Sequence, residues 1–140
     1  MPRDLRFQST LLETGVDPDL PHAVTQQAPL MQATGLRSDD NFHLLLDAGA
    51  NVRPADRNRT TALHLAAMVN AGGQVLTLLE QGADPLAEDR VGATFQNYFW
   101  TTDADIMHDQ AVRERRKVAD WLTAWDIPVH EGAAWTRNRA

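Results

Sequence analysis

Residues 78–84, LLEQGAD, repeat the pattern of residues 45–51, LLDAGAN, with two leucines, an acidic residue, a glycine and an alanine in common. An earlier copy, LLETGVD at residues 11–17, is followed by a proline, as residues 78–84 are. The three glycines stand at positions 15, 49 and 82, so their spacings are 34 and 33. Self-similarity at this period predicts a stack of repeated units, each of which buries its apolar face only against its neighbours.

A second marker keeps the same register. Residues 61–67, TALHLAA, have a counterpart 33 positions earlier at residues 28–34, APLMQAT. This stretch predicts a short inner helix whose small residues allow a neighbouring helix to approach closely. Two independent markers in one register indicate that the repeat governs the fold.

Each copy is also expected to contain an outer helix. These helices should begin near Asp4, Ser38 and Gln74 and end at the three glycines, because glycine tolerates the left-handed conformation beyond a helix C-terminus. Connectors at residues 52–60 and 85–93 contain the proline and glycine that are typical of turns. We interpret the Gly-Gly pair at residues 72–73 as a helix break, not a phosphate-binding loop.

These residues resemble the ankyrin-repeat family, whose pattern combines a finger-like turn, Thr-Pro-Leu-His-x-Ala-Ala, a Leu-Leu pair and Gly-Ala-Asp. The resemblance implies an all-α solenoid of about four helix-turn-helix repeats. The chain departs from the pattern at Arg59, where the family has a turn glycine, and at Ala62, where it has proline, which predicts a looser turn. The best copy matches at Asp56, Thr61, Leu63, His64, Ala66, Ala67, Leu78, Leu79, Gly82, Ala83 and Asp84.

The terminal copies depart furthest from the pattern. The predicted repeats are a partial first one at residues 4–17, then 18–51, 52–84 and a degenerate last one at 85–128, followed by a tail at 129–140. Counting from Leu79 to Leu122 places about ten excess residues near 101–110, before a helix around 113–124. We interpret the last repeat as a C-terminal cap, because a terminal repeat must expose one face to solvent. An alternative is a subunit contact formed by four tryptophans: Trp100, Trp121, Trp125 and Trp135.

Composition excludes several classes of function. The chain has 13 basic and 19 acidic side chains, a net charge of −6 and no cysteine. Without cysteine, disulfides, thiolate metal sites and cysteine nucleophiles are excluded. Negative charge disfavours nucleic-acid binding, and no apolar stretch approaches the roughly 20 residues of a membrane span. A charged N-terminus lacks the apolar core of a signal peptide. We expect a cytoplasmic protein that binds no nucleic acid, membrane or cofactor.

The chemistry-bearing residues do not predict an enzyme. His64 is expected to be structural, because the resemblance implies that it bonds turn backbone and the Thr61 side chain. His22 and His43 should face solvent. No metalloprotease, phosphate-loop or nucleophile-elbow motif is present.

An acidic cluster leaves a metal-binding alternative open. Asp103, Asp105, His108 and Asp109 offer oxygen and imidazole ligands for a divalent cation. We favour an acidic loop with Asp109 as the N-cap of the next helix. On that helix, the basic residues are expected to form a solvated face: Arg113, Arg115, Arg116 and Lys117.

The resemblance places the partner-binding surface on the concave side, along the fingers and inner helices. Apolar contacts at its centre and a polar rim would suit an interface. Carrying the family's contact positions onto this chain one by one gives the predicted site: Arg57, Asn58, Thr60, Met68, Val69, Glu88, Arg90, Val91, Ala93, Thr101 and Thr102.

We therefore expect a non-enzymatic protein that binds a partner protein, as a monomer or within a hetero-complex. Twelve of the 13 basic residues are arginine, which suggests a GC-rich bacterial genome. Small bacterial ankyrin proteins include immunity proteins that neutralise a cognate toxin, and this is the first hypothesis, because acidity suits a basic toxin. The second is an effector or adaptor that binds host or cellular proteins.

Overall fold

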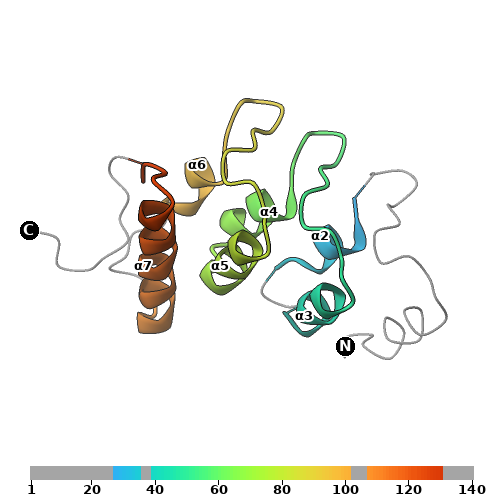
Figure 1. The fold of residues 1–140 in the computed structure, drawn as a ribbon, viewed down its shortest axis with the longest axis horizontal. Coiled ribbons are helices and arrows are strands. Elements are labelled where there is room, and N and C mark those ends of the chain that lie inside the picture. Colours follow the sequence, from blue (N-terminus) through green and yellow to red (C-terminus); the bar gives the residue numbers. More distant parts are fainter. Residues whose placement is uncertain (1–26, 36–38, 102–106, 131–140) are drawn as a thin grey trace, which may run out of the picture.

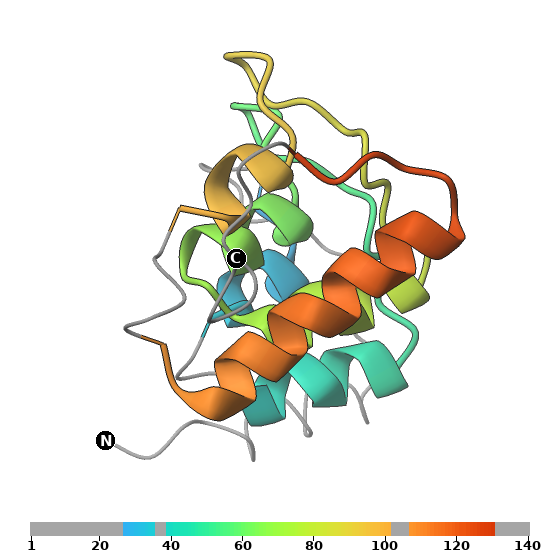
Figure 2. The same ribbon diagram turned by 90° about the vertical axis from the view of Figure 1, so that its left-hand side faces the viewer.

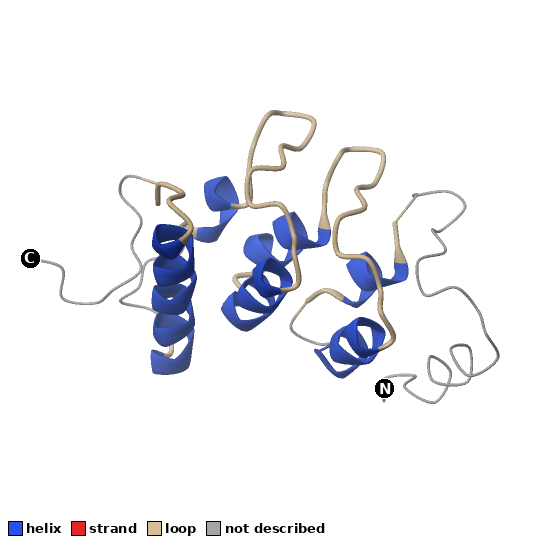
Figure 3. Ribbon diagram, in the orientation of Figure 1, coloured by secondary structure: helices blue, strands red, loops and turns tan. Residues whose placement is uncertain are grey.

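The computed structural model describes residues 27–35, 39–101 and 107–130, and within them the chain forms three pairs of helices. Each pair has a short inner helix and a longer outer helix, and the pairs stack side by side (Figure 1). The helices are α2 (Pro29–Ala33), α3 (Asp39–Asp47), α4 (Ala62–Met68), α5 (Gly72–Glu80), α6 (Gln96–Phe99) and α7 (Asp109–Ala124). No strand is present in the described ranges (Figure 3), so the predicted all-α solenoid is confirmed.

The outer helices α3 and α5 end as the sequence predicts. Gly49 and Gly82 follow them with φ of 87° and 100°, the left-handed region that favours glycine. The next residue then bonds back across the last turn: Ala83 N–H donates to the Leu78 carbonyl at 2.9 Å. Ala50 N–H makes the equivalent bond at 3.0 Å in the preceding repeat.

Helix α7 ends with the same motif but without glycine. Asp126 has φ of 59°, a conformation that aspartate tolerates better than most residues, and Ile127 N–H donates to the Leu122 carbonyl at 2.9 Å. Leu122 is therefore the counterpart of Leu78, not of Leu79 as the sequence count assumed. The separation from Leu78 to Leu122 is 44 positions, so the insertion is one residue longer than expected. Helix α7 also begins at Asp109, four residues before the expected start.

Helix α5 begins at Gly72, two residues before the predicted Gln74. The Gly-Gly pair is therefore the first turn of the helix, and its interpretation as a break is wrong. Helix α7 packs closely against α5 at this turn. A Cβ atom added to Gly72 would lie 2.9 Å from the Glu114 Cβ and 3.6 Å from the Glu114 backbone. The absence of a side chain at Gly72 is what allows the two helices to come this close.

The face of α7 that packs on the stack includes a buried arginine. Val118, Ala119 and Leu122 are buried, and Arg115 lies three, four and seven positions before them on the same face. Its Nη2 donates to the Phe99 carbonyl at 2.8 Å, and its guanidinium lies 5.6 Å from the Phe99 ring centroid. The prediction of a solvated basic face is wrong for Arg115. The other basic residues of this helix are exposed: Arg113, Arg116 and Lys117.

The chain continues to pack after α7. Val129 lies against the core, and Gln96 binds the backbone on both sides of it. Gln96 Nε2 donates to the Pro128 carbonyl at 3.0 Å, and Gln96 Oε1 accepts from His130 N–H at 3.0 Å. Trp100 is buried beside this link and donates its indole N–H to the same Oε1 at 2.9 Å. Trp100 is therefore a core residue and not part of a subunit contact.

Several predictions lie outside the described residues. They are the partial first repeat at 4–17, the start of the second at 18–26, the helix start at Ser38, Thr102, the acidic residues Asp103 and Asp105, His22 and Trp135. Among the residues that are described, no helix has both the length and the apolar character required to cross a bilayer.

We predict opposite effects for alanine at the two adjacent glycines of α5. Gly72→Ala should lower the free energy of unfolding by about 1–3 kcal/mol, because its methyl group would overlap Glu114 near the α7 backbone. Gly73→Ala should be neutral or stabilising by up to about 1 kcal/mol, because its methyl group would meet only the end of a flexible carboxylate. Urea denaturation measures both. Equal stability of the two variants would contradict the close packing of α5 and α7.

Candidate functional site

We call residues 52–60 the first finger and residues 85–93 the second finger; both project from the same end of the molecule, beyond the inner helices (Figures 1 and 2). In the first finger, Asp56 Oδ1 accepts hydrogen bonds from Asn58 N–H at 2.8 Å and Thr60 N–H at 3.0 Å. In the second finger, Asp89 Oδ1 accepts hydrogen bonds from Val91 N–H at 3.1 Å and Ala93 N–H at 3.0 Å. These donors lie 33 positions after Asn58 and Thr60. One carboxylate therefore organises each loop in the same way.

The turn at the tip of the first finger keeps its geometry without the glycine of the family pattern. Arg59 has φ of 60°, close to the 81° of Gly92 at the same position in the second finger. The expectation of a looser turn is wrong, because Arg59 N–H still donates to the Asp56 carbonyl at 3.0 Å. The left-handed conformation costs a non-glycine residue roughly 1–2 kcal/mol.

His64 caps the inner helix α4 and connects it to the second finger. Its Nδ1 accepts from Thr61 N–H at 3.1 Å, and its own backbone N–H donates to Thr61 Oγ1 at 3.3 Å, which together cap the helix. Its Nε2 donates to the carbonyl of Ala93 in the second finger at 2.9 Å. The imidazole is 1% exposed. The expected structural role of His64 is confirmed, because both ring nitrogens are bonded to the chain itself.

The fourth copy replaces this histidine with a shorter side chain. Asn97 lies 33 positions after His64, and its Oδ1 accepts from Thr94 N–H at 2.9 Å, as His64 Nδ1 accepts from Thr61 N–H. Asn97 is exposed. The terminal repeat thus keeps the bond from the threonine N–H to the side chain three residues later, but no side chain caps the first turn of α6, and the long reach of the imidazole is lost.

The two fingers meet through their backbones and enclose a shallow groove. Arg90 N–H donates to the Asn58 carbonyl at 2.9 Å, so the fingers are held side by side. The groove beside this bond, which we call the finger groove, has a volume of about 290 Å³. Its lining residues are Asn58, Thr60, Met68, Asp89, Arg90, Val91 and Tyr98.

Five of the predicted site residues line this groove, and the others are distributed around it. Thr60 lines it but is largely buried, and Ala93 is half-buried with its carbonyl bonded to His64. Thr101 is exposed, and its hydroxyl donates to the Tyr98 carbonyl. Thr102 lies outside the described residues. The remaining predicted residues are exposed: Arg57, Asn58, Met68, Val69, Glu88, Arg90 and Val91.

The sequence prediction missed two residues of the groove, Asp89 and Tyr98. The Tyr98 hydroxyl donates to Asp89 Oδ2, and its ring meets the His64 ring edge-on at 6.1 Å. This hydrogen bond, with those from the Ala93 and Val91 N–H groups, lowers the pKa of Asp89 below its usual 3.8. The same bond raises the pKa of Tyr98 above 10.0. The sequence contained a signal for Asp89, because Asp89 lies 33 residues after Asp56 and so occupies the same position in the repeat.

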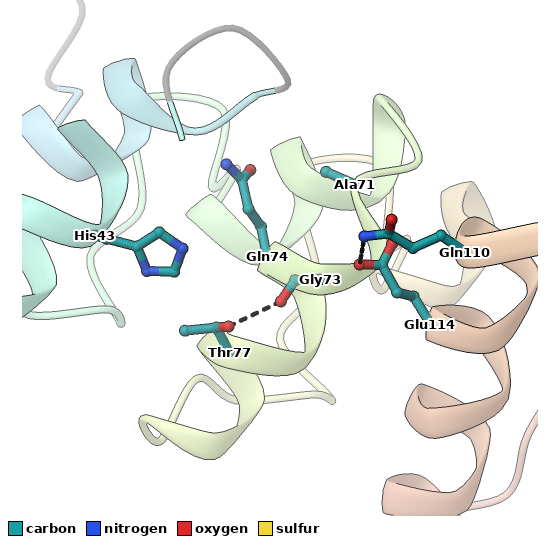
Figure 4. A pocket seen from close by; sticks show the side chains of 7 residues that line it. All are labelled: His43, Ala71, Gly73, Gln74, Thr77, Gln110 and Glu114. Atoms are coloured by element: carbon teal, nitrogen blue, oxygen red, sulfur yellow. Dashed lines mark hydrogen bonds between the residues drawn. The ribbon is translucent and has the colours of Figure 1, made fainter. Parts of the chain in front are cut away.

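A second pocket lies on the opposite side of the stack, between the outer helices, and has a volume of about 480 Å³ (Figure 4). Thr77 Oγ1 donates to the Gly73 carbonyl at 2.8 Å, and Gln110 Nε2 donates to Glu114 Oε2 at 3.4 Å. Gln74 reaches from this pocket to the backbone of Gly35, with bonds of 3.0 and 2.9 Å. Only the Gln74 bonds link two repeats; the other two bonds lie within α5 and within α7.

His43 is exposed at the edge of this pocket, as predicted. Figure 4 shows its ring on α3 and Glu114 on α7 at opposite sides of α5. This arrangement does not pair the two groups for acid–base chemistry.

The described part of the predicted acidic cluster does not form a metal centre. His108 is the N-cap of α7 and Asp109 is its first residue, so the prediction of Asp109 as N-cap is wrong by one position. Within residues 27–35, 39–101 and 107–130, no group of three or more histidines and carboxylates is placed to hold a metal ion.

Comparison with known proteins identifies the repeat. A family model described as ankyrin repeats, in three copies, matches residues 5–89. The chain is 37% identical over 129 residues to Zygote-specific protein 3 of Chlamydomonas reinhardtii, which covers 89% of this chain and 31% of that protein. It is also 37% identical over 65 residues to the Ankyrin repeat and LEM domain-containing protein 1 homolog of Caenorhabditis elegans, covering 46% and 9%. The chain thus spans less than a third of either relative.

The contact between Asp89 and Tyr98 predicts a pH dependence. Because folding lowers the pKa of Asp89, the contribution to stability is present above pH 3.8 and is lost as the pH falls through the lower folded value. Folding raises the pKa of Tyr98, so the contribution is also lost as the pH rises above 10.0. Tyr98→Phe should therefore lower Tm more at pH 7 than at pH 2, as measured by circular dichroism.

Trp125→Phe is the control, since this exposed side chain carries no titratable group, and its effect on Tm should be the same at both pH values. An equal loss of Tm in Tyr98→Phe at pH 7 and pH 2 would show that the hydrogen bond does not stabilise the Asp89 carboxylate.

Proposed function

The chain belongs to the ankyrin-repeat family, whose repeats are protein-interaction modules, and from this premise we propose that it binds a partner protein at the finger groove. The groove joins the two fingers to the inner helix α4, the side of the stack that the family resemblance implied for binding. We assign no catalytic role to any residue of this surface.

The observation that carries the proposal is exposed apolar surface beside the groove. Five large apolar side chains are exposed in the described residues; two of them line the groove, and a third is next to one of these in the chain. They are Met68, Val69 and Val91, with exposed fractions of 46%, 44% and 81%. Exposed apolar groups that cluster within a polar rim are typical of protein interfaces.

The finer hypotheses from the sequence concern the identity of the partner. We retain the immunity protein that neutralises a cognate toxin as the first, and an effector or adaptor as the second. Both relatives come from eukaryotes, so they do not support the bacterial origin that the arginine-rich composition suggests. The relatives are also much longer than this chain, so we infer nothing about its partner from theirs.

Site-specific photo-crosslinking tests the surface. A photoreactive phenylalanine analogue at Val91 should form an adduct of one defined mass in an extract of the native cell, whereas the same group at Arg113, exposed on α7, should not. The unlabelled chain should compete for the adduct. A Met68→Glu, Val69→Glu variant should compete at least about tenfold less well, because two apolar contacts are replaced by charges.

Circular dichroism of the competitor is the folding control for this experiment. If the folded Met68→Glu, Val69→Glu variant competes as well as the natural chain, or if Arg113 gives the same adduct as Val91, the partner binds elsewhere.

A further inference from the structure

The carboxylates inside the two fingers are already bonded. Asp56 accepts two backbone N–H groups of its own loop, and Asp89 accepts two N–H groups and the Tyr98 hydroxyl. They therefore hold the fingers in shape and are not directed towards a partner. Glu88 is the only other acidic residue of the fingers, and it is exposed.

The arginines of the same surface are exposed and have no acidic partner. Arg57, Arg59 and Arg90 form no ion pair with any described residue. Arg57 and Arg90 occupy the same position in successive fingers. They are also adjacent, because Arg90 Nη2 lies 3.5 Å from the Arg57 carbonyl. The two fingers together contain four arginines and three acidic residues, so their charge is +1 on a chain whose net charge is −6; these residues are Arg53, Arg57, Arg59, Arg90, Asp56, Glu88 and Asp89.

The backbone of the second finger has a carbonyl acceptor at the position through which the first finger binds its neighbour. The Asn58 carbonyl accepts from Arg90 N–H, which links one finger to the next. Val91 is the counterpart of Asn58, 33 positions later, and among the described residues no group donates to its carbonyl. Its side chain is 81% exposed. This position offers a partner one backbone acceptor next to an apolar contact.

Resting on the proposed function, we propose that the segment bound at the finger groove is an extended acidic stretch of a partner protein. Its carboxylates would bind Arg57 and Arg90, and an apolar side chain between them would contact Met68 and Val91. A backbone N–H of the segment would donate to the Val91 carbonyl. Arginine matches carboxylate geometry closely.

A protein segment fits this surface better than a nucleic acid. Met68 and Val91 line the same groove as Arg90, and the rest of the chain is acidic, so a long polyanion would be repelled outside the fingers. The net charge had suggested a basic partner. The charge at the site favours acidic residues in the segment that makes the contact, whatever the charge of the whole partner.

Peptide selection tests the charge of the segment. A library of random peptides displayed on phage is selected against the immobilised full chain at low salt. We expect enrichment of aspartate and glutamate around one apolar residue. A synthetic peptide from the strongest clone, followed by fluorescence anisotropy, should bind Arg57→Glu, Arg90→Glu at least about tenfold more weakly, because two attractive pairs become repulsive.

Arg113→Glu, Lys117→Glu is the matched control, with the same change in net charge on the exposed face of α7, and it should bind like the natural chain. Enrichment of basic or uncharged peptides, equal binding to the two double variants, or displacement by a short DNA duplex would overturn the acidic segment.

The failures of the two proposals are distinguishable. If the selected peptides are uncharged and their binding depends on Met68 and Val91 but not on the arginines, the proposed binding surface stands. Only the proposal that its occupant is acidic is then overturned. A selection that enriches no peptide, or peptides indifferent to Met68→Glu, Val69→Glu, would overturn both.

Discussion

The finger surface depends on one side chain, His64, which is bonded to the chain at both ring nitrogens. One nitrogen accepts from Thr61 N–H and fixes the start of the inner helix, while the other donates to the Ala93 carbonyl in the next finger. An inner helix and the finger of the following repeat are therefore positioned by the same imidazole. The bond between Arg90 and Asn58, and with it the finger groove, follows from that placement.

The last described repeat departs from the one before it at the position of His64. Asn97 keeps the bond to Thr94 N–H but is too short to reach a following finger as His64 does, and aromatic residues replace the small residues of the inner helix. Arg115 and Gln96 then tie α7 and the chain after it onto α6. Helix α7 and the bonded residues 128–130 thus pack on this side of α5 and α6.

The features that recur every 33 residues could be predicted from the sequence, because each is set by local geometry. Gly82 and Gly49 each follow an outer helix, and His64 caps the inner helix of the copy that matches the pattern best. Contacts made by the degenerate repeat were not predictable in this way. Arg115 is buried because α7 packs across two helices. Asp126 takes the glycine position after an insertion that shifts the register. Tyr98 meets the Asp89 carboxylate only in the folded stack. For the same reason, the sequence placed the binding surface on the fingers but not the groove between them.

Amide hydrogen exchange in a His64→Asn variant tests the central role of this side chain most directly. Asparagine should keep the bond to Thr61, as Asn97 does with Thr94, but should not reach Ala93. We predict that the Asp89 and Arg90 amides exchange about tenfold faster or more, as expected for the loss of one buried hydrogen bond, while the first finger is unchanged. Unchanged protection of both amides in the folded variant would contradict the account.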